Sequence, residues 1–206
     1  MSRSLHTDPY DLRAARRVVA PFRRRADEPR VARRRATGGP PARVEVRATP
    51  ARRGFVHPAG VGDVARVLDF FGPPAVYGLR RVELRQRVGG DRSGLLVAGL
   101  RPPGVVVLVE QPRPPWLLAG RLAAESLRRL HRAGAQVRAG ATHTRVDWPD
   151  ETLRDFVLFD GLMHEIGHHA IQHDARTMRT ADHERRADAF AAACRTAWST
   201  DGGAAW

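Results

Sequence analysis

Residues 162–170 have the sequence LMHEIGHHA, in which His164, Glu165 and His168 form an H-E-x-x-H pattern. Two histidines four positions apart on an α-helix project from one face, so both imidazoles can reach a single zinc ion. Glu165 lies beside that face, where its carboxylate can take a proton from zinc-bound water. Apolar residues on two sides of the segment from about 150 to 169 predict a helix that runs through the middle of a domain. Histidines in such a place must be hydrogen-bonded or bound to metal.

A second helix is predicted from about Ala181 to Trp198, and it carries two acidic residues one turn apart. Glu184, sixteen positions after His168, can be a third zinc ligand. Asp188 can accept a hydrogen bond from the far ring nitrogen of a ligating histidine, which fixes the tautomer of that ring. Three protein ligands leave a fourth position for water, as catalytic zinc sites require.

Together these positions resemble the gluzincin group of zinc metallopeptidases, of which thermolysin is a familiar member. Between Leu153 and Cys194 the chain has H-E-x-x-H followed by Glu184-x-x-Ala187-Asp188. This combination is also similar to membrane-embedded proteases with an E-x-x-A-D motif and to the soluble ImmA/IrrE-type regulatory peptidases. The resemblance implies a small zincin-like domain that hydrolyses peptide bonds in a protein or peptide substrate. By analogy with that fold, the strand at Val105–Val109 or the hairpin before it would hold an extended peptide by edge pairing.

The resemblance assigns a role to each residue of the motif. Zn²⁺ would be the cofactor, with Glu165 as the general base and Asp188 supporting a ligand. The three metal ligands would be His164, His168 and Glu184.

Other interpretations of the neighbouring residues stay open. Asp174 occupies the place where metzincins have their third ligand, but those enzymes need glycine where this chain has Ile171. Asp160, one turn before His164, could support a histidine or could be an ordinary helix acid. His173 or His183 could stabilise an oxyanion or could be solvated loop residues.

The positive charge of the chain is concentrated in its first segment. Among 206 residues there are 35 arginines and no lysine, and the net charge is +13. Residues 1–56 hold 15 of those arginines against 5 acidic residues, together with a Gly-Gly-Pro-Pro stretch. Such a segment cannot bury enough apolar surface to offset its ordering entropy, so we predict a mostly disordered arm over 1–56 and the zincin-like domain over 57–206.

Two rival functions follow from these observations. The arm could form weak contacts with nucleic acid or an acidic partner, which would make the protein a nucleic-acid-binding module. Alternatively, a non-proteolytic zinc-binding regulator could use the same ligands for stability or sensing.

Composition also limits the location of the protein. Cys194 is the only cysteine, so an internal disulfide is impossible and a reducing compartment is favoured. No apolar run approaches the ~18 residues expected of a membrane span. We therefore predict a cytoplasmic protein without membrane contact, in which Cys194 and Tyr77 belong to the core.

The remaining periodicities predict an α+β fold, a small sheet with helices beside it. A central strand is predicted at Val105–Val109, because its residues are apolar and mostly β-branched. The other predicted elements are a helix over 61–71 stopped by Gly72, strands over 82–88 and 95–100, a loop over 111–115, a helix over 117–132 and an extended segment over 136–146.

Overall fold

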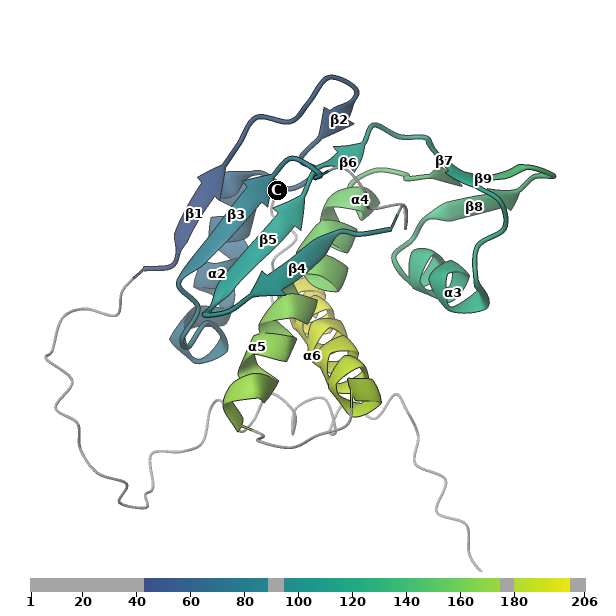
Figure 1. The fold of residues 1–206 in the computed structure, drawn as a ribbon. Helices are drawn as coiled ribbons and strands as arrows, with labels where there is room; N and C mark the ends of the chain where they lie inside the picture. The colour runs from purple at the N-terminus through teal and green to yellow at the C-terminus, as the bar shows by residue number, and fades with distance from the viewer. Residues whose placement is uncertain (1–42, 89–94, 175–179, 201–206) are drawn as a thin grey trace, which may run out of the picture.

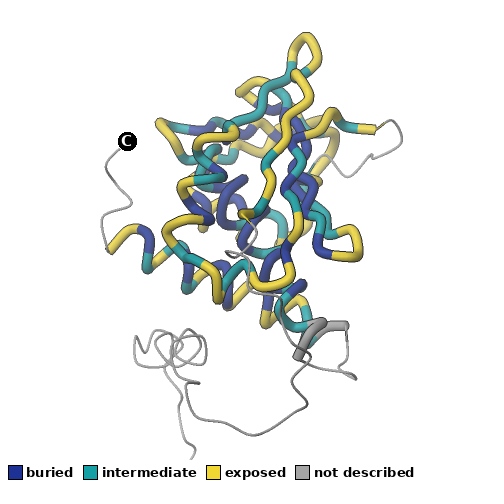
Figure 2. The backbone as a smooth tube through the Cα atoms, turned by 90° about the vertical axis from the view of Figure 1, so that its left-hand side faces the viewer, coloured by how far each residue is buried: buried dark blue, intermediate teal, exposed yellow. Residues whose placement is uncertain are grey.

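The computed structural model describes residues 43–88, 95–174 and 180–200, and these form an α+β structure (Figure 1). The predicted fold class is confirmed. Buried residues, in dark blue, gather toward the middle of the molecule, and exposed residues lie on its outer turns (Figure 2). Within the described residues no helix combines the length and the apolar character that crossing a membrane requires.

The main sheet has four strands in the order β1-β3-β5-β4. β1 (Glu45–Ala48), β3 (Arg81–Arg85) and β5 (Val105–Val109) are parallel to one another. β5 is flanked on both sides and almost wholly buried, as its apolar sequence predicts. β4 (Ala98–Arg101) pairs with β5 in the antiparallel direction and forms one edge of the sheet. That edge faces the helices that carry the predicted metal ligands (Figure 1).

The predicted boundary between arm and domain is wrong, because the folded structure begins before residue 57. β1 pairs with β3 along its whole length, and β2 (Phe55–Val56) pairs with β6 (Gln111–Pro112). β1 is mostly exposed and is held by backbone hydrogen bonds, so it needs no apolar run that a sequence could reveal. Residues 1–42 lie outside the described residues, and both their predicted disorder and their predicted contacts stay predictions.

Helix α2 (Val61–Ala75) covers one face of this sheet and buries Val64, Val67 and Leu68 against it. Gly72 interrupts the helix with a φ of 68°, in the left-handed region that favours glycine. The regular helix therefore ends at this glycine, as predicted. One further helical turn follows after the kink.

A second, three-stranded sheet has the order β7-β9-β8. Its strands are β7 (Trp116–Ala119), β8 (Gln136–Ala139) and β9 (His143–Asp147), and helix α3 (Ala124–Arg132) lies between β7 and β8 in the chain. The single helix predicted over 117–132 is therefore wrong. Its first residues pair with β9, and Gly120, with a φ of 71°, separates that strand from the shorter helix.

The long helix predicted from about 150 to 169 is present in three continuous parts. These are α4 (Thr152–Asp155), the π-helical segment η1 (Phe156–Met163) and α5 (His164–Asp174). All of η1 except Asp160 is buried, as expected for a helix covered on two sides. Helix α6 (Thr180–Thr200) packs along α5 and η1 and buries the predicted stripe of Ala187, Phe190, Ala191, Cys194 and Trp198.

Candidate metal centre

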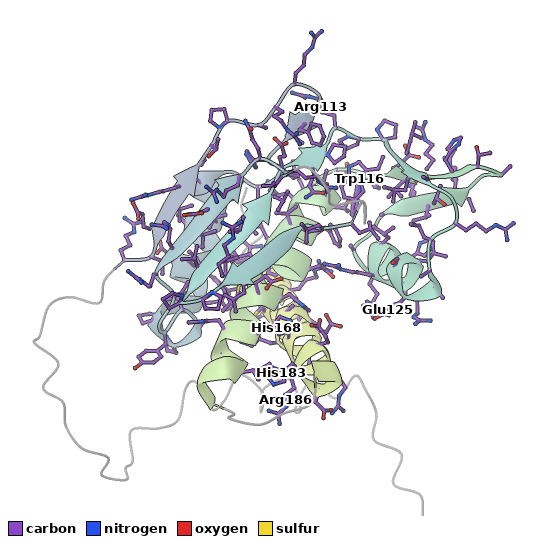
Figure 3. The ribbon with its side chains drawn as sticks, viewed as in Figure 1. Arg113, Trp116, Glu125, His168, His183 and Arg186 are labelled. Carbon is purple, nitrogen blue, oxygen red and sulfur yellow. The ribbon has the colours of Figure 1, made fainter. Side chains whose placement is uncertain are left out.

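His164 and His168 stand on the first two turns of α5 and face α6 (Figure 3). Each side chain is only 15% exposed. Their Nε2 atoms lie 3.1 Å apart. Residues four positions apart share a helix face, and here both rings turn toward the same point.

Glu184 on α6 completes a triangle with these two rings. One carboxylate oxygen lies 3.5 Å from His164 Nε2 and the other lies 3.3 Å from His168 Nε2. A tetrahedral zinc ion with bonds of about 2.0–2.1 Å requires its ligand atoms to be separated by about 3.3–3.4 Å. The separation of the two rings and their contacts with Glu184 are close to this value, with each ring contacting a different oxygen of the carboxylate, and one ligand atom from each residue lies within 4.8 Å of the others. The Glu184 side chain is 59% exposed, so the triangle is accessible from solvent.

Asp188 lies one turn after Glu184 and accepts a hydrogen bond from His164 Nδ1 over 3.0 Å. A neutral His164 therefore carries its proton on Nδ1, which leaves the Nε2 lone pair free for a metal ion. Burial lowers the pKa of His164, but the hydrogen bond and the charge of Asp188, with Glu165 and Glu184, outweigh it and raise that pKa above 6.5. The hydrogen bond from His164 is the main reason why the pKa of Asp188 is lowered.

Glu165 follows His164 directly and lies between α5 and the edge strand β4. Burial is the main reason why its pKa is raised above 4.5; the two histidines oppose that shift, and the charge of Glu184 adds to it. The backbone N–H of Leu100, on β4, donates a hydrogen bond to the carboxylate. A carboxyl group with a raised pKa is suited to accept a proton and release it again near neutral pH.

Gly167 allows the two helices of the site to approach each other. A Cβ atom at this position would lie 3.1 Å from Ala187 Cα and 3.2 Å from a ring carbon of Phe190. Ala187 is three residues after Glu184, so the contact also determines how near Glu184 comes to the histidines. The sequence pattern alone predicts only a slightly weakened helix at Gly167, because nothing local reveals that α6 packs there.

Four other residues lie outside the metal cluster. The carboxylate of Asp160 pairs with Arg195 on α6 and does not join the cluster. His169 is buried and its Nε2 lies 3.2 Å from the backbone oxygen of Tyr77, which ties α5 to the end of α2. Tyr77 itself is 77% exposed, so its predicted core position is wrong. Cys194 is buried as predicted, and burial raises the pKa of its thiol to about 12.

The remaining candidates do not enlarge the site. Among the described residues, the one group of histidine, cysteine or acidic side chains able to hold a metal ion is His164, His168 and Glu184. His183 is on α6 but does not belong to that group. The side chains of His173 and Asp174 lie outside the described residues, so both predictions for them stay open.

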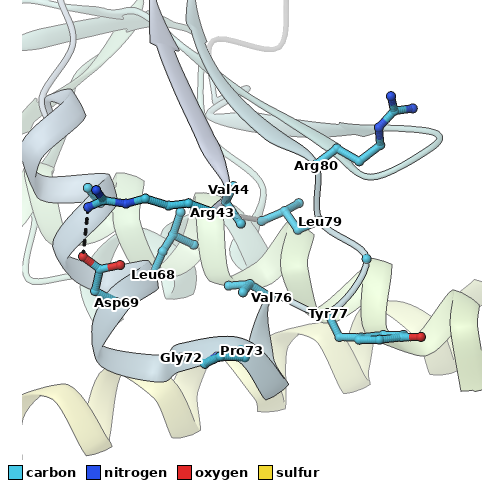
Figure 4. A pocket seen from close by; sticks show the side chains of 12 residues that line it. Arg43, Val44, Leu68, Asp69, Gly72, Pro73, Val76, Tyr77, Leu79 and Arg80 are labelled. Carbon is cyan, nitrogen blue, oxygen red and sulfur yellow. Dashed lines mark hydrogen bonds and ion pairs between the residues drawn. The ribbon is translucent and has the colours of Figure 1, made fainter. Parts of the chain in front are cut away.

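A cavity of about 510 Å³ lies away from the metal centre, between the end of α2 and the start of β1 (Figure 4). Its lining includes Leu68, Val76 and an ion pair between Arg43 and Asp69 with a 3.5 Å separation. None of the predicted site residues lines this cavity. It therefore has no part in the metal centre.

No family model matches this chain, and no curated protein or solved structure is similar enough to count as a match. The function must therefore be inferred from the geometry of the site itself.

Proposed function

We propose that this protein is a zinc-dependent metallopeptidase. The observation that carries the proposal is the cluster of His164 Nε2, His168 Nε2 and the Glu184 carboxylate, whose contacts of 3.1, 3.5 and 3.3 Å are close to the ligand separation in a zinc tetrahedron. Glu165 lies directly beside it. A bound Zn²⁺ would polarise the scissile carbonyl and acidify water. The exposure of Glu184 favours a catalytic site over a closed structural one, because substrate and water need access.

Glu165 is proposed to move the proton of the reaction. As general base it takes a proton from the attacking water, and as general acid it then delivers that proton to the leaving amine. Its raised pKa favours the first transfer, because a carboxylate with a higher pKa is a stronger base. Asp188 assists by holding the ring of His164 in one tautomer and one orientation.

The edge strand β4 is proposed to bind the substrate. β5, at Val105–Val109, has neighbours on both sides and offers no free edge, whereas β4 is paired on one side only. The N–H of Leu100 points from β4 toward Glu165, so an extended peptide paired with this strand would pass the catalytic carboxylate. Of the two predicted peptide-binding segments, the hairpin strand before β5 is therefore the one we propose.

The proposal is tested by measuring metal content and peptide hydrolysis on the full chain. We expect about one zinc per chain and cleavage of unfolded protein or mixed peptide substrates. Glu165→Gln should retain zinc and lose about 10²–10⁴-fold in kcat/KM, the usual contribution of a general base. Glu45→Gln makes the same chemical change on the opposite edge strand, β1, and should leave both quantities unchanged.

Two results would overturn this function. A protein that binds no zinc has no metal centre. A zinc-loaded protein that cleaves no peptide, and whose Glu165→Gln variant behaves like the parent, would instead be a non-proteolytic zinc-binding regulator.

A further inference from the structure

Three arginines on β4 and α3 have no carboxylate ion-pair partner among the residues that the structure describes. Arg101 ends the edge strand β4, directly after Leu100. Arg129 and Arg132 lie on the last turn of α3. We refer to Arg101, Arg129 and Arg132 as the basic rim.

The position of Arg129 is defined by its contacts with η1. Its guanidinium donates a hydrogen bond to the backbone oxygen of Asp160 over 2.8 Å and stacks above the ring of Phe156 at 5.0 Å. Asp160 is one helical turn before the ligand His164. Arg132, three residues further along α3, is exposed. Both arginines are near enough to Asp188 for their charges to lower its pKa, after the larger effect of the His164 hydrogen bond.

Three other arginines of α4 and α6 have acidic partners, whereas Arg186 of α6 has none among the described residues. Arg195 pairs with Asp160, Arg185 with Asp182 over 2.8 Å and Arg154 with Glu151 over 3.2 Å. The Arg195 pair joins α6 to η1, and the other two pairs are local to α6 and α4. The rim arginines have no such ion pair, and the exposed guanidinium groups of Arg101 and Arg132 are open to a bound molecule.

The acidic residues of the site face the metal ligands or are buried beside them. Glu184 faces the two histidine rings, Asp188 is bonded to His164, and Glu165 is partly buried beneath β4. A metal ion would add two positive charges at the same place. A substrate that brings negative charge is therefore favoured over one that brings none.

We propose that the basic rim selects peptides with aspartate or glutamate side chains close to the scissile bond. This inference rests on the proposed function. A peptide paired with β4 would extend past Arg101, and its alternate side chains would repeat about every 7 Å along the cleft. Acidic side chains on that peptide would meet Arg101 at one end or the α3 arginines beside η1.

The test uses two peptides that differ only by glutamate or glutamine at each position near the cleavage site. Exposed ion pairs contribute roughly two- to fivefold each, so we expect the parent protein to favour the glutamate peptide about fivefold in kcat/KM at low salt. Raising the ionic strength from about 0.05 M to about 0.5 M should remove most of this preference. Arg132→Gln should reduce it to about twofold, and Arg132→Glu should reverse it in favour of a matched lysine peptide.

Arg113→Gln is the matched control, because Arg113 is exposed and points outward far from His168 (Figure 3). It removes the same charge and should leave the preference unchanged. If Arg132→Gln lowers kcat equally for both peptides, the rim only supports Asp188 and the inference is wrong. Equal cleavage of the glutamate and glutamine peptides by the parent protein also overturns it.

A binding measurement separates failure of this inference from failure of the proposed function. Fluorescence anisotropy on the Glu165→Gln variant reports peptide affinity without turnover, and we expect about fivefold tighter binding of the glutamate peptide. If the parent protein cleaves nothing, the proposed function fails, and the anisotropy ratio still decides whether the rim prefers acidic peptides. If the two peptides bind with equal affinity in that measurement, the proposed preference of the basic rim for acidic peptides is wrong.

Discussion

Gly167→Ala tests whether the distance between α5 and α6 controls the metal centre. The added methyl group would lie 3.1 Å from Ala187 Cα, 3.2 Å from Phe190 Cδ1 and 3.3 Å from Phe190 Cβ. Carbon atoms in favourable contact are about 3.5–4.0 Å apart, so the helices must separate by about 0.5 Å. Because Ala187 is a backbone contact on α6, this separation also moves Glu184 away from both histidines.

This movement is expected to change both the free energy of unfolding and the affinity for zinc. Overpacking typically costs about 1–3 kcal/mol, and replacing a helical glycine by alanine returns up to about 1 kcal/mol. We therefore expect the free energy of unfolding to fall by about 0–3 kcal/mol. The contacts of Glu184 with the two rings, 3.3 and 3.5 Å, would lengthen beyond the edge of a zinc tetrahedron. Zinc affinity should fall about tenfold or more, which corresponds to about 1.4 kcal/mol.

Competition with a chelating dye measures the zinc affinity, and urea denaturation of the metal-free protein measures the stability. Gly62→Ala is the matched control, because Gly62 is also in a helix but a Cβ there would meet nothing within 4 Å. That control should gain about 0.4–1 kcal/mol and bind zinc normally. If Gly167→Ala shows the same gain and an unchanged zinc affinity, the close helix contact does not position Glu184, and the reasoning is refuted.

Four further predictions concern the residues that support the site and the sheet. Asp188→Asn should weaken zinc binding about 10- to 100-fold by chelator competition, because the His164 tautomer is no longer held. As general base Glu165 must be ionised, so kcat/KM should fall on the acid side of the pH profile, and an activity that does not fall with decreasing pH would contradict its assignment as base. The pKa of Asp188 is lower in the folded protein than its ordinary value of 3.8, so the ionised carboxylate stabilises the fold above pH 3.8. This stabilisation is lost as the pH falls through the lower pKa of the folded protein. The difference in stability between the parent and Asp188→Asn in urea denaturation should therefore vanish at that low pH. Glu110→Gln should cost about 2–4 kcal/mol in urea denaturation, because the fully buried carboxylate accepts hydrogen bonds from Arg52 and the backbone of Arg87; a loss as small as that of a surface acid would contradict this.

Several elements of the fold were predictable because their signals are local. The apolar run of β5 marks a strand with neighbours on both sides, and Gly72 marks the end of a regular helix. The first part of the helix predicted over 117–132 was wrong, because pairing with another strand outweighed the helical spacing of the leucines. Leu117 and Leu118 fit a helical stripe, but they pair with Arg145 and Thr144 of β9 instead.

The candidate site also has one part that the sequence could predict and one part that it could not. The four-residue spacing of His164 and His168 determines a shared helix face wherever the helix lies, since helical periodicity is a property of the backbone. The sequence also identifies Glu184 and Asp188 as one edge of a second helix. It cannot say that this edge meets the histidines, because the distance between two helices depends on packing between residues far apart in the chain.

The sequence by itself determined the chemical groups of this protein: two imidazoles, a carboxylate between them and an acidic pair on a following helix. Only the tertiary structure decided that β4 is a free antiparallel edge beside Glu165, that Gly167 lets α6 approach, and that the α3 arginines lie next to the site. The physical reason is that side-chain direction along a helix follows from local geometry. Strand order and helix contact are instead chosen by the burial of apolar surface over the whole chain.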